Sequence, residues 1–196
     1  MNNELTEMIF LLDRSGSMSG LEKDTIGGFN SVVKEQCKLP GDVLLTTVLF
    51  DHEYEVLWNG VEAKSVMLTE SDYFIRGTTA LLDAIGKTIA EVENRLKKTK
   101  EELRAGKVIF VITTDGMENA SKEFTYEKVH SLIRNKQETY NWEFIFLGAN
   151  IDVAKEATSL GISVENAYDF EASSDGVDKM YSIVHEEIAV RRKKWK

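Results

Sequence analysis

The chain has 196 residues and a net charge of −9, with 42% hydrophobic and 29% charged residues, which is ordinary globular chemistry. This length can bury a substantial core, and the lone Cys37 excludes a disulfide within the chain. The negative charge argues against general nucleic-acid binding, because phosphates attract cationic surfaces. No apolar run approaches the roughly 20 residues of a membrane span, and no basic segment precedes the first apolar run as in a signal peptide. We therefore expect a cytoplasmic protein.

Short apolar strands alternate with amphipathic helices along the chain, which favours a mainly parallel sheet covered on both faces. The predicted elements are, in chain order, a strand at 8–12, a helix at 21–37, strands at 43–50 and 54–58, a helix at 81–96, a strand at 108–113, a helix at 126–136, a strand at 142–147, a short helix from about 152 to Gly161, a strand at 164–169 and a helix at 175–194.

The strand at 54–58 follows its predecessor too closely for a crossover helix, so we expect an antiparallel edge strand there. Residues 61–75 read as irregular. The pattern predicts a doubly wound, Rossmann-like α/β sandwich of three layers. Its sheet has about six strands, mostly parallel with one antiparallel edge strand, and helices lie on both faces. No linker or repeat divides the chain, so 1–196 is expected to be a single domain.

Acidic side chains follow two of the predicted strands. The first apolar run ends at Asp13-Arg-Ser-Gly-Ser17, and the run before Thr114 ends at Asp115-Gly116. Alternate residues of an extended segment point the same way, so Asp13, Ser15 and Ser17 can converge on one small object. If the two strands are neighbours, Asp115 joins them where the strand order reverses. Such hard oxygen donors suit Mg²⁺ or Mn²⁺.

A third polar loop, Arg76-Gly-Thr-Thr79, enters the helix at 81–96 and can bring another hydroxyl to the same point. The combination of Asp13-Arg-Ser-Gly-Ser17, Gly77-Thr-Thr79 and Thr114-Asp-Gly116 resembles the von Willebrand factor A (VWA) domain and its metal-ion-dependent adhesion site (MIDAS). The three motifs stand in the family's order, and the resemblance extends from Glu7 to the last helix.

The resemblance implies direct metal ligation by Ser15, Ser17 and Thr79, with Asp13 and Asp115 holding coordinating waters. Thr79 is preferred over Thr78 because of the Gly-x-Thr spacing. Neutral hydroxyl ligands leave the cation much of its charge, so it can accept an Asp or Glu carboxylate of a protein partner. The implied protein is a stand-alone intracellular binding module, an adaptor or assembly component without catalytic residues. In the family, partner binding is also coupled to movement of the last helix, here 175–194.

Other interpretations of the same residues remain open. Asp13 and the two serines could simply cap a helix and form a turn. A Mg²⁺-dependent phosphatase-like hydrolase would use Asp13 as nucleophile, but Ser15 stands where such enzymes carry their general acid–base carboxylate. An EF-hand is excluded because Met18 replaces the required glycine. A Ser-His-Asp hydrolase finds no serine in a Gly-x-Ser-x-Gly turn.

Several polar residues near these motifs have both a structural and a functional interpretation. Asp51 could form a turn or shape the rim of the site, and Asp83 could sit in a helix N-terminus or support the metal loop. Glu118 and Asn119 could contact a partner, and Arg76 could attract an acidic ligand or be merely solvated. The scattered His52, His130 and His185 are expected on surfaces or helix faces.

Overall fold

The computed structural model describes residues 1–193, so the predicted end of the last helix at Lys194 lies outside the described part of the chain. A six-stranded sheet with the order β3-β2-β1-β4-β5-β6 forms its centre. All neighbouring strands are parallel except β2 and β3, which form an antiparallel pair at one edge. The strands are β1 (Asn2–Asp13), β2 (Asp42–Phe50), β3 (Tyr54–Glu62), β4 (Ala105–Thr114), β5 (Glu143–Gly148) and β6 (Ala167–Asp169).

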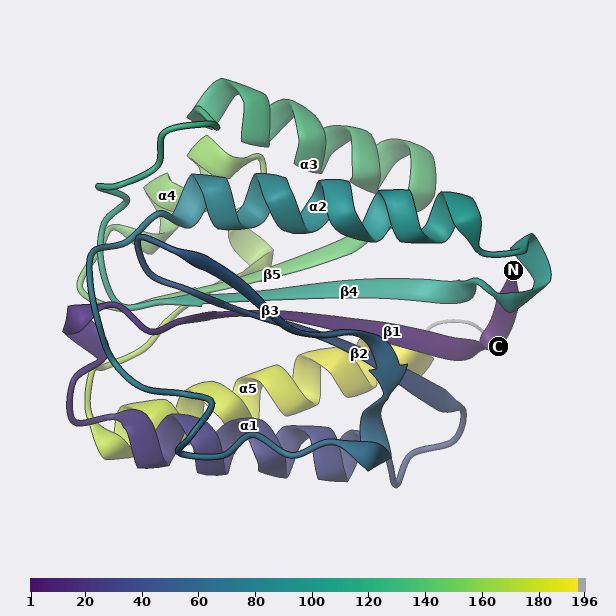
Figure 1. The fold of residues 1–196 in the computed structure, drawn as a ribbon, viewed down its shortest axis with the longest axis horizontal. Helices are drawn as coiled ribbons and strands as arrows, with labels where there is room; N and C mark the ends of the chain where they lie inside the picture. The colour runs from purple at the N-terminus through teal and green to yellow at the C-terminus, as the bar shows by residue number, and fades with distance from the viewer. Residues whose placement is uncertain (194–196) are drawn as a thin grey trace.

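Helices cover both faces of the sheet, as Figure 1 shows. One face carries α1 (Glu22–Gln36) and α5 (Ser174–Lys193), and the other carries α2 (Leu81–Lys98), α3 (Tyr126–Tyr140) and α4 (Val153–Leu160). The predicted three-layer, doubly wound architecture is therefore confirmed. None of the helices within residues 1–193 is long and apolar enough to cross a membrane.

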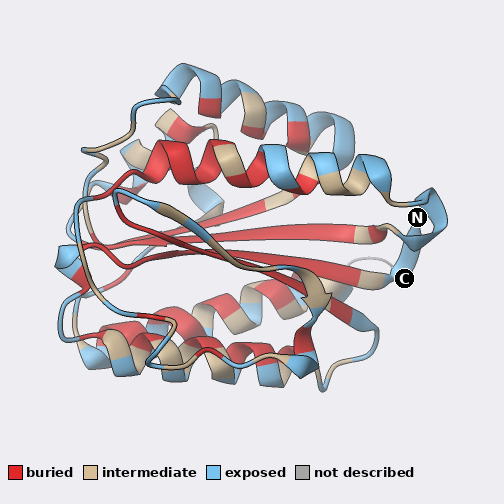
Figure 2. Cartoon of the chain, in the orientation of Figure 1, coloured by how far each residue is buried: buried red, intermediate tan, exposed pale blue. Residues whose placement is uncertain are grey.

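The core lies in two layers, one on each side of the sheet, because strand side chains alternate between faces. In β1, Met8, Phe10 and Leu12 pack toward α1 and α5, whereas Ile9 and Leu11 pack toward α2 and α3. All five are fully buried, and Figure 2 shows the central strands as the most continuously buried part of the molecule. Strands buried on both faces are the reason why the sequence runs are almost purely apolar.

Several element boundaries differ from the predictions. β3 continues to Glu62 rather than 58, because its pairing with β2 extends into the segment predicted as irregular. β4 begins at Ala105 rather than 108. β1 begins at Asn2 rather than residue 8, because its polar first half is still paired with β2 and β4. α3 continues to Tyr140 and ends on Asn141, which adopts a left-handed conformation. The predicted strand at 164–169 is shorter, since Val164–Asn166 forms a 3-10 turn before β6.

The two ends of α5 are fixed by side chains. At its start, the Ser173 hydroxyl accepts a hydrogen bond from the Gly176 N–H at 3.1 Å, which is an N-cap interaction. At its end, the buried Lys107 of β4 donates to the carbonyls of Arg191 and Arg192, both at 2.6 Å. These carbonyls belong to the last turn of a helix, where backbone acceptors have no intrahelical partner.

Candidate metal centre

The two predicted acids meet at the carboxyl edge of the sheet, between β1 and β4. These strands pair in parallel, with Leu12 opposite Thr113, so both strands end at the same level of the sheet. The backbone N–H of Asp115 donates to Asp13 Oδ2 at 3.3 Å, which places the two residues in contact. The strand order reverses between β1 and β4, and this is where open α/β sheets form ligand-binding crevices.

The Asp13 carboxylate organises the loop that follows β1. Its Oδ1 accepts the Ser15 N–H at 2.7 Å, and its Oδ2 accepts the Thr114 hydroxyl at 2.7 Å. The backbone carbonyl of Asp13 also accepts a hydrogen bond of 2.5 Å from the buried Tyr73 hydroxyl. Asp13 thus joins the loop after β1 to the end of β4, and Tyr73 holds the same residue from the irregular segment before α2.

Three hydroxyl groups gather beside the acids. Ser15 Oγ and Ser17 Oγ are 3.2 Å apart. A Cβ atom placed on Gly116 would be 3.3 Å from Ser17 Oγ and 3.7 Å from Thr79 Oγ1, so both hydroxyls border the same small space. Ser15 and Thr79 are buried, whereas Ser17 is exposed at the rim. Thr78 is exposed, which supports the choice of Thr79 from the Gly-x-Thr spacing.

Backbone contacts hold the threonine loop against the serine loop. The Gly16 N–H donates to the Gly77 carbonyl at 3.1 Å. Gly77 has a φ of +70°, and a Cβ there would be only 2.0 Å from His52 Nδ1, so this position requires glycine. The Thr79 N–H donates to Asn119 Oδ1 at 2.9 Å, which fixes Thr79 from the opposite side.

The electrostatics of the two acids suit a bound cation. Burial raises the pKa of Asp13, and its hydrogen bonds from Ser15, Thr114 and Asp115 offset this only in part. Burial also raises the pKa of Asp115, and the nearby Asp13 charge adds to that effect. Asn150 donates to Asp115 Oδ1, but Oδ2 is buried without a hydrogen-bond partner among the described residues. An unpartnered buried carboxylate oxygen is costly unless a cation or its water satisfies it.

The donor set fits a hard divalent cation that keeps some of its waters, because every available donor is an oxygen. Two carboxylates and three hydroxyls lie together: Asp13, Asp115, Ser15, Ser17 and Thr79. Within residues 1–193, no three His, Cys, Asp or Glu side chains gather in a metal-binding arrangement. A cation at this edge would therefore depend on the hydroxyl groups.

Most of the secondary candidates have structural partners. Glu118 accepts the Leu82 N–H at 2.9 Å and so caps the start of α2, while Asn119 holds Thr79. Asp83 accepts the backbone N–H groups of residues 122–124 at 2.9–3.0 Å, which ties the loop after β4 to α2. Arg76 is paired with Asp51 and Glu53. His52 and His130 are exposed, and the half-buried His185 packs beside Gln36.

Three residues around the centre were not predicted from the sequence. These are Tyr73, Asn150 and Arg14, the last of which is completely buried and paired with Asp51 and Glu55. Asn150 carried a usable signal, because it is a polar residue that follows the end of a third parallel strand, β5. Tyr73 and Arg14 carried none, because their partners are distant in the sequence.

No protein-family model and no curated protein matches the sequence, but many solved structures share its fold. Proximal thread matrix protein 1 from the mussel byssus superimposes with a TM-score of 0.65 at 16% identity, over 93% of this chain and 46% of that protein. A further structure of the same protein has a zinc-occupied MIDAS motif. VWA2, an ArnB paralog from Sulfolobus acidocaldarius, gives a TM-score of 0.59 at 17% identity, over 95% of this chain and 45% of that one.

The pilus adhesin SpaC from Lactobacillus rhamnosus GG gives a TM-score of 0.66 at 13% identity, over 93% of this chain and 30% of SpaC. The chain thus spans less than half the length of each of these proteins. At such low identity the likeness concerns the fold alone. This chain has the fold of a von Willebrand factor A domain.

Proposed function

We propose that this chain is a single metal-dependent protein-interaction domain whose binding centre is the cluster of Asp13, Ser15, Ser17, Thr79 and Asp115. The observation that carries the proposal is the buried, unpartnered Oδ2 of Asp115 beside three hydroxyl groups. The cation is Mg²⁺ or Mn²⁺, since both accept an all-oxygen set of hydroxyls, carboxylates and waters.

Each residue has a separate task in this proposal. The hydroxyls of Ser15, Ser17 and Thr79 are the direct ligands. Asp13 and Asp115 orient coordinating waters and supply the compensating negative charge. Because Oδ1 of Asp115 accepts a hydrogen bond from Asn150, its Oδ2 is the oxygen that would bind a coordinating water.

The partner is a protein that presents an Asp or Glu side chain. A divalent cation held by neutral hydroxyls keeps an attraction for one further carboxylate, which a set of direct carboxylate ligands would weaken. The exposed position of Ser17 leaves the centre open to such a ligand. The domain would then act as an adaptor or assembly component, without catalysis of its own.

A phosphatase-like role is less well supported. Both carboxylate oxygens of Asp13, the nucleophile of that alternative, already accept hydrogen bonds from Ser15 and Thr114. Ser15 also occupies the position of the acid–base carboxylate. Turnover of a generic phosphoester with Mg²⁺, lost in Asp13→Asn, would reverse this preference.

The test is calorimetric titration of Mg²⁺ and Mn²⁺ into metal-stripped protein. We expect saturable one-site binding that is lost in Ser15→Ala/Ser17→Ala. The matched control is Ser131→Ala/Ser182→Ala, which removes two exposed helix hydroxyls and should bind metal like the wild type. As a second readout, metal at 100 times its Kd should raise the unfolding free energy by about 2.7 kcal/mol. Absence of binding to the wild-type protein would contradict the proposal.

A further inference from the structure

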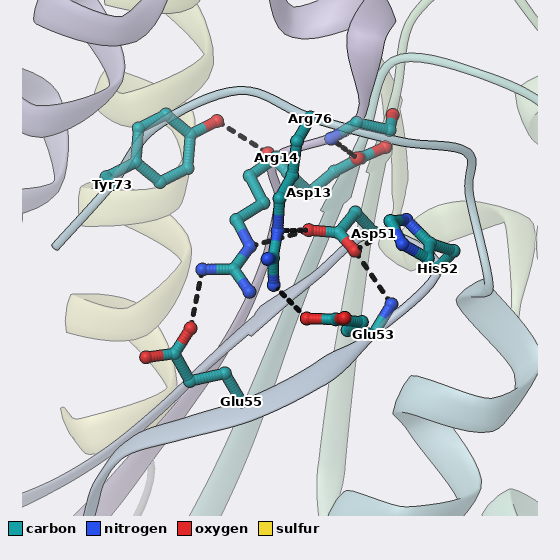
Figure 3. Close-up of polar contacts among 9 residues, drawn as sticks. Asp13, Arg14, Asp51, His52, Glu53, Glu55, Tyr73 and Arg76 are labelled. Carbon is teal, nitrogen blue, oxygen red and sulfur yellow. Dashed lines mark hydrogen bonds and ion pairs between the residues drawn. The ribbon is translucent and has the colours of Figure 1, made fainter.

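A cluster of charged residues lies directly behind the candidate metal centre and joins three separate segments. Figure 3 shows it: the side chains of Arg14 and Arg76 converge on Asp51, with Glu53 and Glu55 around them. Arg14 stands between the site residues Asp13 and Ser15. Because successive residues of an extended segment point in opposite directions, the Arg14 side chain leaves the centre on the other side.

Asp51, the first residue after β2, is the shared acceptor of the cluster. Its Oδ2 accepts hydrogen bonds from Arg14 Nε and Arg76 Nε, both at 2.8 Å, and its Oδ1 accepts the Glu53 N–H at 2.7 Å. Burial would raise the pKa of Asp51, but these hydrogen bonds outweigh burial and hold the pKa below its usual value. Asp51 is therefore ionised and binds two guanidinium groups from two different loops.

Backbone hydrogen bonds follow the same connections. The Arg14 N–H donates to the Phe50 carbonyl and the Arg76 N–H donates to the Arg14 carbonyl, both at 2.9 Å. The Asp51 carbonyl accepts the Ala80 N–H at 2.8 Å. One neighbour of each site residue, Ala80 beside Thr79 and Arg14 beside Ser15, is thus attached to the cluster. No direct hydrogen bond joins the side chains of Thr79 and Ser15.

The Arg14 guanidinium is fully enclosed. A second nitrogen, Nη1, donates to Glu55 Oε2 at 2.6 Å, and the ring of Phe74 lies 5.4 Å from the guanidinium carbon. The same ring lies 5.6 Å from the guanidinium carbon of Arg76. A planar group that binds two carboxylates and packs against an aromatic ring matches arginine and not lysine.

We infer that Arg14 is a positioning residue: through Asp51 and Arg76 it sets the distance between the serine loop and the threonine loop, and thereby the metal affinity of the centre. The inference rests on the proposed function for its metal readout. It has a second, metal-independent readout, because loosening of Arg14 must release the contact between Gly16 and Gly77 that joins the same two loops.

The test compares Arg14→Lys with Arg134→Lys, which changes an exposed arginine in α3 that is paired with Glu138. In metal-free protein we expect amide exchange at Gly16 and Arg76 to accelerate roughly ten- to a hundred-fold in Arg14→Lys. Exchange at buried Ile133 of α3 should stay unchanged, whereas a merely structural role would accelerate both. In the control variant all of these amides should behave as in the wild type.

The second measurement is the Kd for Mg²⁺ and Mn²⁺ of the same variants. Arg14→Lys should weaken binding roughly 10- to 100-fold, the usual effect of losing a residue that supports metal ligands. Unchanged exchange at Gly16 together with wild-type affinity would overturn the inference. Faster exchange at Gly16 in a protein that binds no metal would uphold the positioning role and overturn the proposed function instead.

Should Arg14→Lys fail to fold, Arg76→Lys is the second variant. Arg76 binds the same Asp51 carboxylate, but its side chain is 35% exposed, so the change is easier to accommodate. The same acceleration at Gly16 is expected there. Adding Arg76→Lys to Asp51→Asn should have little further effect, because Asp51→Asn already removes the charged carboxylate that Arg76 binds. Fully additive effects would contradict a shared network.

Discussion

Two neighbouring glycines of α1, Gly27 and Gly28, should respond in opposite ways to replacement by alanine. A Cβ on Gly27 would meet nothing within 4 Å, whereas a Cβ on Gly28 would be 2.1 Å from Cδ2 of Tyr181 in α5. The Cγ and Cε2 atoms of the same ring would be at 2.7 and 2.8 Å. The ring cannot swing away easily, because Tyr181 is buried between α1 and the sheet.

The magnitudes follow from these contacts. Replacing glycine within a helix gains about 1 kcal/mol, which is the whole expected effect of Gly27→Ala. Gly28→Ala gains the same amount but overfills the interface, which costs about 3 kcal/mol at the upper end of the usual range. We therefore expect a net loss of about 2 kcal/mol, or a fall in Tm of roughly 4–8 °C for a domain of this size.

Urea unfolding followed by circular dichroism would measure both variants against the wild type. Replacing the ring by Tyr181→Leu should lower the stability less in the Gly28→Ala background than in the wild type, because the clash disappears with the ring. Equal stability of the two alanine variants would refute the reasoning, since it would mean that α1 and α5 do not pack at the distance described.

Three further perturbations test other parts of the molecule. Gly116→Ala should lower the Mg²⁺ affinity roughly ten-fold or more, because the added methyl group enters the space beside the site hydroxyls. Gly16→Ala is the control in the same titration and should change the affinity little, since its Cβ would make only an ordinary contact at 3.5 Å. The pKa of Asp83 is lowered because the hydrogen bonds from three backbone N–H groups outweigh the effect of burial. The ionised side chain therefore contributes stability above the unfolded pKa of about 3.9, and this contribution is lost as the pH falls through the lower folded pKa. Asp83→Asn should therefore destabilise the protein most at neutral pH and progressively less below about pH 4 in urea unfolding; a pH-independent difference would contradict this. Lys107→Met should lower the unfolding free energy by about 1–3 kcal/mol and accelerate amide exchange in the last turn of α5, and a change confined to other regions would be inconsistent with its described contacts.

The residues of the candidate metal centre could be picked out from the sequence because each lies in a local pattern. Asp13 and Asp115 terminate apolar runs, and parallel strands bring such ends to one edge. Thr79 follows from its place before α2. The mainly parallel sheet with one antiparallel edge strand was predicted in the same way, because the spacing between strands decides which connections can be parallel and which must form a hairpin.

The residues that support the centre could not be read from the sequence, because their roles depend on distant partners. An arginine in a loop is ordinarily exposed to solvent. Arg14 is buried because it pairs with Asp51 and Glu55, which lie 37 and 41 positions further along the chain. The early start of β1 was missed for a related reason. Glu7 looks like a surface residue, but it is fully buried and paired with Arg95 of α2 and with Thr46 of β2.

The attachment of α5 at its far end has a mechanical consequence. Its 20 residues form a rod of roughly 30 Å. The rod begins beyond the carboxyl edge of the sheet, the edge that also carries the candidate metal centre, and it is held by Lys107 at the opposite edge. A helix held at its C-terminal end can tilt about that end, but it cannot easily move along its own axis. A shift of about 2 Å at its first turn would tilt the axis by about 4° while leaving the last turn in place.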